Sequence, residues 1–211
     1  MNYLLVSPNF PISQEFFAKN LREKGINVLG IGSESYDALS QTLKDNLTEY
    51  FRVNDLEDYE EVFRAVAFLT YKHGKIDRIE SNNEYWLELD ARLREDFNVY
   101  GVKPKQLEFT KYKSKMKTMF KEAGARVAKG YAANSKEELH GILKKLKLPL
   151  IAKPDNGVGS ANTYKLTIQR DVEEFINEWD ENISYFFEEF VGDGVLCTYD
   201  GLINQHGDIV F

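Results

Sequence analysis

The sequence predicts an α/β protein in which a parallel sheet is followed by a smaller α+β unit. Over the first hundred residues, short apolar runs alternate with amphipathic stretches, a rhythm typical of βαβ units. Later in the chain, an apolar strand is followed by a glycine-rich loop and another β-prone stretch. The chain has 211 residues, which is enough for one to three compact units with a sizeable core.

Composition excludes several classes of protein. Acidic residues number 34 against 27 basic ones, and the net charge of -7 argues against a general nucleic-acid surface. The single cysteine, Cys197, excludes a disulfide framework and a cysteine-based metal cage. The N-terminal apolar run is too short for a signal peptide, and no other segment approaches a membrane span. We therefore expect a cytoplasmic protein without nucleic-acid or membrane partners.

The first unit is expected to extend to about Gly101. Strands are predicted over 3–6, 27–31 and 76–80, and helices over 13–24 and 57–71. Ser81-Asn82-Asn83-Glu84 has the spacing of a capping box and predicts a helix that ends before Gly101. No G-x-G-x-x-G follows the first strand, so nothing marks a dinucleotide site.

Two loops of this unit are candidates for ligand contacts. In open α/β sheets, ligands bind at the carboxyl ends of strands, which here are followed by Ser7 to Phe10 and by Asn82 to Glu84. Ordinary turn and cap chemistry explains the same residues and is the competing interpretation.

A lysine-rich helix is predicted from about Thr110 to Ala123. Its apolar stripe contains Met116, Met119 and Phe120, and one turn before this stripe comes Lys113. Lys113 is therefore the lysine that we expect to point inward. The alternative is that all lysines of this helix form a solvated face.

The strand from Pro149 to Pro154 carries Lys153 and leads into a glycine-rich loop that ends at Ser160. Backbone N–H groups of such a loop form an anion-sized nest, and Lys153 adds a positive charge beside it. A Walker A loop has its lysine after the glycines, whereas here the lysine comes first. Residues 161–168 are β-prone, so we expect a flap of two strands over phosphates. An ordinary β-turn is the alternative.

The remaining elements are predicted from periodicity and caps. Two helices are expected, one capped by Ser135 and extending to Lys147, and one capped by Asp171 and extending through Trp179. Strands are expected over 125–132, 185–191, 195–203 and 209–211.

These motifs together resemble the ATP-grasp superfamily, and most closely its carbamoyl-phosphate synthase large chain and biotin carboxylase branch. The residues that carry the resemblance are, in order, Lys113, Lys153-Pro154, Gly157-Val158-Gly159-Ser160 and Phe187-Glu188-Glu189-Phe190-Val191. The resemblance implies a Rossmann-like pre-ATP-grasp domain over residues 1–103. It also implies the N-terminal part of an ATP-grasp domain over residues 104–211.

The resemblance implies a role for each motif. Lys113 and Lys153 would contact ATP phosphates, and Gly157, Val158, Gly159 and Ser160 would form the flap. Adenine would be read by main-chain groups of Glu188, Glu189, Phe190 and Val191, although a charged strand end also explains the two glutamates.

The chain also departs from the family. An acidic residue often holds the ribose where this chain has Val195, with Asp193 as the nearby substitute. Asp200 is given no fixed role, because a polar strand residue or a bulge before Gly201 explains it equally well. Family members place their magnesium ligands in the last part of the fold, and no counterpart occurs here. We therefore expect the ATP-binding part of a truncated ligase.

The expected cofactors are ATP and Mg²⁺, and the expected substrates are a small carboxylate, or bicarbonate, and an amine. Alternatives are a regulatory nucleotide-binding module, a subunit completed by a separate chain, and a plain α/β domain. A homo-oligomer and a complementing chain are the protein partners left open.

Overall fold

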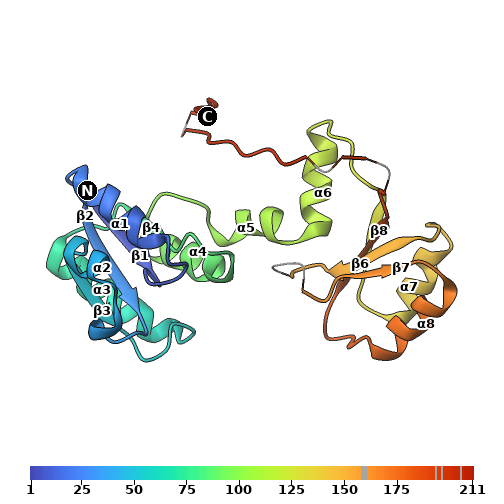
Figure 1. The fold of residues 1–211 in the computed structure, drawn as a ribbon, viewed down its shortest axis with the longest axis horizontal. Helices are drawn as coiled ribbons and strands as arrows, with labels where there is room; N and C mark the ends of the chain where they lie inside the picture. The colour runs from blue at the N-terminus through green and yellow to red at the C-terminus, as the bar shows by residue number, and fades with distance from the viewer. Residues whose placement is uncertain (158–160, 193, 196, 205) are drawn as a thin grey trace. The chain divides into compact units, whose positions relative to one another are not determined.

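The structure, a computed structural model, describes residues 1–157, 161–192, 194–195, 197–204 and 206–211. The chain divides into two compact units (Figure 1). The first comprises Met1–Gly124 with Asn156–Ala161, and the second comprises Ala125–Asp155 with Asn162–Phe211. The domain boundary expected at residue 103 stays a prediction.

The first unit contains a four-stranded parallel sheet with the strand order β3-β2-β1-β4. The strands are β1 (Asn2–Val6), β2 (Asn27–Gly32), β3 (Glu49–Arg52) and β4 (Arg78–Glu80). The α-helices are α1 (Gln14–Glu23), α2 (Gln41–Asn46), α3 (Tyr59–His73), α4 (Leu87–Asp96), α5 (Pro104–Lys111) and α6 (Lys113–Glu122). Two 3₁₀ turns are η1 (Tyr36–Ala38) and η2 (Glu84–Trp86).

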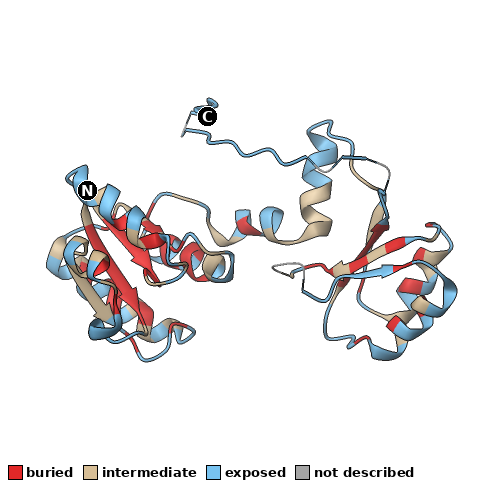
Figure 2. Ribbon diagram, in the orientation of Figure 1, coloured by how far each residue is buried: buried red, intermediate tan, exposed pale blue. Residues whose placement is uncertain are grey.

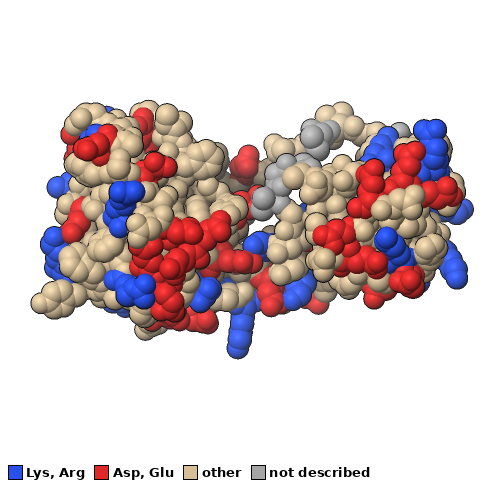
Figure 3. Space-filling view, turned by 90° about the horizontal axis from the view of Figure 1, so that it is seen from below, with Lys and Arg blue, Asp and Glu red and all other residues tan. Residues whose placement is uncertain are grey.

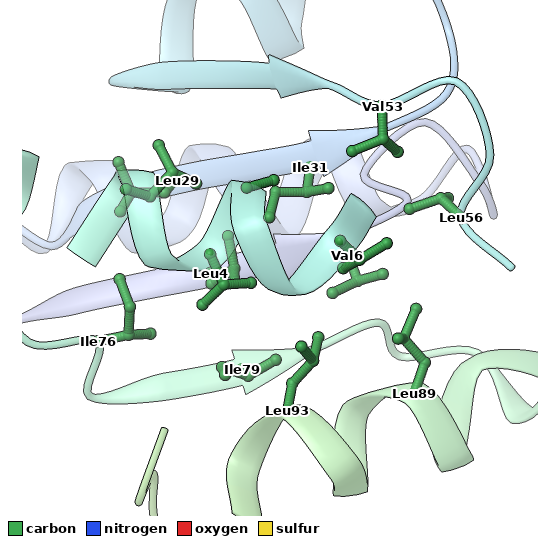
Figure 4. Close-up of a cluster of buried hydrophobic side chains, with 14 of the residues drawn as sticks. Leu4, Val6, Leu29, Ile31, Val53, Leu56, Ile76, Ile79, Leu89 and Leu93 are labelled. Carbon is green, nitrogen blue, oxygen red and sulfur yellow. The ribbon is translucent and has the colours of Figure 1, made fainter. Parts of the chain in front are cut away.

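Helices cover both faces of this sheet, so its central strands are buried throughout (Figure 2). On β1, Leu4 and Val6 pack with residues of α3 and α4, as the close-up in Figure 4 shows. Tyr3 and Leu5 point to the opposite face, where they pack with residues of α1 and α2. Burial on both faces explains why β1 reads as a continuous apolar run rather than an alternating one.

The strands and helices predicted before Gly101 are confirmed, but the sequence does not predict α2 and β3. β3 is an edge strand with a charged residue at each end, so its apolar signal is weak. The predicted capping residue Ser81 is wrong, because Asn83 is the cap of the η2 turn that leads into α4. The Asn83 side chain accepts from Tyr85 N at 3.0 Å, whereas the Ser81 hydroxyl bonds to Asp90.

The predicted lysine helix is wrong at its beginning, because the chain forms two helices that are separated at Tyr112. This residue has extended backbone angles (φ -86°, ψ 120°), so Lys113 becomes the first residue of α6. The expected apolar stripe is also largely uncovered, since Met119 is 44% exposed and Phe120 is 47% exposed.

A buried carboxylate, Asp90, lies beside the end of β4. Its Oδ2 accepts hydrogen bonds from Ser81 N at 2.9 Å and Ser81 Oγ at 2.6 Å, and it lies 3.8 Å from Arg94 Nη2. Burial raises the pKa of Asp90, and the Ser81 hydrogen bonds oppose this rise only in part. The folded protein therefore binds the Asp90 proton more tightly than the unfolded chain does.

We predict a pH-dependent effect of Asp90→Asn on stability. Between the ordinary pKa of aspartate and the raised pKa of Asp90, the folded state binds more protons, so wild-type stability falls as pH rises. Asparagine keeps an acceptor for Ser81 but does not titrate. The unfolding free energy of the wild type minus that of the variant should decrease from pH 4 to pH 7 in urea titrations. A difference that grows with pH would contradict the assignment.

The second unit contains a four-stranded antiparallel sheet with the order β5-β8-β6-β7. Its elements are β5 (Gly130–Ala133), α7 (Lys136–Leu143), β6 (Leu150–Pro154), β7 (Tyr164–Leu166), α8 (Gln169–Glu178) and β8 (Tyr185–Glu189). Both helices pack on one face, where a cluster of aromatic rings includes Phe175, Trp179, Tyr185 and Phe187.

Several strand and helix boundaries predicted for this unit are wrong. β5 begins at Gly130 instead of residue 125. Asp171 is the third residue of α8 rather than its cap, and it accepts from Thr167 N at 2.7 Å. Most of 195–203 is not a strand in the described part, since a strand requires a hydrogen-bonded partner. Only an Ile203–Ile209 bridge forms there.

No helix in the described part of the chain is both long enough and apolar enough to cross a membrane.

Candidate functional site

The second sheet has a face that neither α7 nor α8 covers, and Lys153 lies on it. Strand alternation puts Ile151 and Lys153 of β6 on this side, together with Phe186 and Glu188 of β8. The intervening residues, such as Ala152 and Phe187, belong to the cluster under the helices. We call the side with Ile151, Lys153, Phe186 and Glu188 the helix-free face.

Lys153 Nζ forms a hydrogen-bonded ion pair with Glu188 Oε1 on the helix-free face. The two residues lie diagonally across β6 and β8, because Ile151 is the register partner of Glu188. The lysine side chain is 25% exposed and the glutamate side chain is 12% exposed. The pair is therefore partly desolvated, and the carboxylate holds the ammonium group against the sheet.

A glycine shapes the neighbouring part of this face. A Cβ atom at Gly130 would lie 2.6 Å from the Phe186 ring and 2.9 Å from Glu188 Cβ. Because such contacts are too close for any side chain, the Phe186 ring can lie over β5 only where there is a glycine. Gly130 thus sets the position of Phe186 beside the ion pair.

A second cation, Lys165, lies at the other edge of the helix-free face. Its register partner is Ile151, and its Nζ lies 3.8 Å from the centroid of the Phe190 ring. Sequence reasoning missed this residue. The signal that was available is strand alternation, which places Lys165 on the same side as Lys153 once β7 is paired with β6.

The end of β8 has main-chain groups that the sheet does not use in the regular pattern. Glu189 N donates to Lys129 O at 3.0 Å, but Lys129 N donates back to the Glu189 carboxylate at 3.1 Å rather than to the main-chain oxygen. Phe190 N donates to Pro149 O at 3.2 Å. Among the described residues from Tyr185 to Val191, Phe190 is the last whose N–H donates to the chain beside β8, since Pro149 directly precedes β6. Val191 follows it and is 76% exposed.

Lys113 is placed by the first helical turn of α6. Its Nζ donates to Gly157 O at 2.9 Å, so the ammonium group lies at the beginning of the predicted flap. Val158, Gly159 and Ser160, the other predicted flap residues, lie outside the described residues. The expected second strand of the flap is confirmed as β7.

The remaining candidates are Asp193 and Val195, considered for the ribose, and Asp200. Val195 and Asp200 are exposed, and Asp193 lies outside the described residues. Within the described part of the chain, no three His, Cys, Asp or Glu side chains gather into a metal-binding group.

The two candidate loops of the first unit follow adjacent strands, β1 and β4. Ser7 and Asn82 open these loops with positive φ values of 53° and 49°. Gln14 of α1 contacts the second loop, since Asn82 Nδ2 donates to Gln14 Oε1 at 3.3 Å and Gln14 Nε2 donates to Ser81 O. The two loops begin at the same edge of the sheet, because β1 and β4 pair in parallel, while turn chemistry still accounts for both.

The fold is that of the ATP-grasp enzymes, since a unit with a parallel sheet precedes a unit with an antiparallel sheet, as in the solved structures that match this chain. The biotin carboxylase domain of Hydrogenobacter thermophilus 2-oxoglutarate carboxylase, in complex with MgADP, ADP and bicarbonate, matches with a TM-score of 0.70. It is 18% identical, and the match covers 90% of this chain and 44% of that one. N5-carboxyaminoimidazole ribonucleotide synthetase from Thermus thermophilus matches with a TM-score of 0.69 at 15% identity, over 100% of this chain and 52% of that one.

Amino acid ligases are among the similar proteins. The L-arginine-specific L-amino acid ligase of Bacillus subtilis is 27% identical over 165 residues, which are 78% of this chain and 39% of the ligase. The L-amino acid ligase of Bacillus licheniformis has a TM-score of 0.68 at 18% identity, over 90% of this chain and 44% of that one. No family model matches the sequence. The chain thus spans about half the length, or less, of the proteins that it resembles.

Proposed function

We propose that the second unit binds ATP on its helix-free face, as part of a ligase that activates a carboxylate. The observation that carries this proposal is the Lys153–Glu188 pair, which fixes a cation on the face that no helix of the unit covers. With Lys165, this face has two ammonium groups against one carboxylate, and this excess of positive charge favours an anionic ligand.

The phosphates are assigned to lysines and to backbone N–H groups. Lys153 supplies charge from the strand, and Lys113, which contacts Gly157, supplies charge beside the beginning of the flap. A lysine is a compact point charge with three donors and so suits a phosphate oxygen. In this proposal Gly157, Val158, Gly159 and Ser160 add N–H donors to the same phosphates.

Adenine is assigned to the segment from Glu189 to Val191. Lys129 N–H bonds to the Glu189 carboxylate, which leaves the Glu189 main-chain oxygen as an acceptor for the adenine amino group. The N–H of Val191, beyond the last donor to the sheet, is assigned to a ring nitrogen. The Phe190 ring, already in contact with Lys165, supplies an aromatic surface beside the base.

The proposed chemistry is formation of an acyl phosphate, which an amine then attacks to form a C–N bond. Magnesium, when bound, neutralises charge on the transferred phosphoryl group. We assign no residue of this chain to magnesium, because no three or more His, Cys, Asp or Glu side chains gather among the described residues. What this chain contributes is the binding of nucleotide and the electrostatic stabilisation of phosphate oxygens by lysines.

A nucleotide titration tests the proposal. In calorimetry, ADP and MgATP should bind with one site per chain, and GDP should bind at least tenfold more weakly because guanine has a carbonyl where adenine has its amino group. Absence of heat with any of these nucleotides, at concentrations up to several millimolar, would contradict the proposed nucleotide site.

A further inference from the structure

The first unit contains a pocket that the proposed nucleotide site does not use. It has a volume of about 420 Å³ and lies where the N-terminal end of α3, η2 and α4 meet. Small-molecule sites commonly have volumes of about 300–1,000 Å³, so this pocket has a suitable size. Its wall includes the aromatic residues Tyr59, Tyr85 and Trp86.

Three of the five charged residues that line the pocket already have a partner in its wall. Lys111 Nζ lies 2.6 Å from Glu88 Oε1, and the Tyr85 hydroxyl donates to Glu57 Oε1. These contacts leave two charged lining residues, Glu84 and Arg92, whose side chains have neither a hydrogen bond nor an ion pair within the described part of the chain.

Arg92 is held in place without using its hydrogen-bond donors. Its guanidinium carbon lies 3.5 Å from the centroid of the Tyr59 ring, which is a stacked cation–π arrangement. Stacking uses the face of the guanidinium and leaves the N–H groups at its edge available to a ligand. The chain therefore presents an oriented donor fork and a carboxylate in one aromatic pocket.

We propose that this pocket binds a free α-amino acid. The ligand's carboxylate pairs with the Arg92 fork, and its ammonium group pairs with Glu84 beside the Trp86 ring. A simple anion is disfavoured, because the pocket wall has three glutamates against one arginine and one lysine. Acidic side chains also gather on the face of the first unit shown in Figure 3. That this amino acid is the substrate of a ligase rests on the proposed function, whereas its binding to the pocket does not.

Tryptophan signals provide a direct test, because the chain has only two tryptophans. Trp86 lines the pocket, whereas Trp179 is buried in the second unit and donates its indole N–H to Ile183 O. L-phenylalanine, added without nucleotide, should move the Trp86 indole NMR signal in a saturable way and leave the Trp179 signal unchanged. 2-Phenylethylamine lacks the carboxylate and 3-phenylpropionate lacks the ammonium group, so each should bind at least tenfold more weakly.

Matched variants separate the pocket from general effects. Arg92→Gln and Glu84→Gln should each weaken L-phenylalanine binding at least tenfold, while the exposed controls Arg64→Gln and Glu95→Gln should not change it. A fixed Trp86 signal in the wild type, or equal binding of the three probes, would overturn the proposal. Because nucleotide is absent, these outcomes are independent of the ADP titration, which tests the proposed function alone.

Discussion

Lys153→Ala should weaken nucleotide binding by about 10- to 100-fold. A hydrogen bond to a charged group contributes about 1.5–3 kcal/mol, and each 1.4 kcal/mol changes a dissociation constant tenfold. The substitution also removes the lysine partner of Glu188, whose side chain is 12% exposed, and leaves that negative charge near the proposed phosphates. Calorimetry with ADP measures the change, and circular dichroism shows whether the variant is folded.

Two further variants separate the two contributions to weaker ADP binding, which are the loss of the lysine and the remaining charge of Glu188. In the double variant Lys153→Ala/Glu188→Gln the negative charge of Glu188 is absent, so any remaining weakening comes from the loss of the lysine alone. Glu188→Gln by itself should bind ADP at least as tightly as the wild type, because Lys153 is then released from its carboxylate. Lys147, exposed in the same unit, provides the control Lys147→Ala, which should behave as the wild type. Unchanged binding by Lys153→Ala would refute its assignment to the phosphates.

Phe187→Ala should lower the unfolding free energy of the second unit by about 3–5 kcal/mol. Phe187 is fully buried, and its ring centroid lies 5.6 Å from that of Phe175 and 5.9 Å from that of Trp179. The whole stability of a domain is only about 5–15 kcal/mol, so the loss is a large fraction of it. Urea denaturation followed by the indole NMR signal of Trp179 reports on this unit directly, because the other tryptophan, Trp86, belongs to the first unit.

The control for this prediction is Phe120→Ala in α6. Phe120 is 47% exposed and belongs to no buried cluster, so its loss should cost about 1 kcal/mol or less. Equal effects of the two substitutions would show that the aromatic cluster does not hold the second sheet and its helices together.

Much of the fold follows from the sequence because its elements have strong local signals. β1 and β2 are continuous apolar runs, and α7 is capped by Ser135, whose hydroxyl accepts from Glu138 N at 3.3 Å as the capping pattern predicts. Elements without such signals were missed or misplaced. β3 is a short edge strand, and the break at Tyr112 changes one backbone angle without a glycine or proline to mark it.

The candidate site was predictable in its motifs but not in its contacts. The glycine-rich loop pointed to Lys153, and the order of motifs pointed to Lys153 and Glu188 separately. Their ion pair depends on the register of β6 against β8, which joins residues 35 positions apart in the chain. The same is true of Lys165 and Phe190, which are brought together by the pairing of β7 with β6 and the path of the chain after β8.

The central claim is that nucleotide binds to the helix-free face of the second sheet. Backbone amide NMR of the ¹⁵N-labelled protein, titrated with ADP, tests it most directly. The largest shift changes should fall on Ile151, Lys153, Glu188 and Val191, with small changes in α7 and α8, which cover the opposite face. Shift changes that concentrate in α7 and α8, or no changes at saturating ADP, would contradict the assignment.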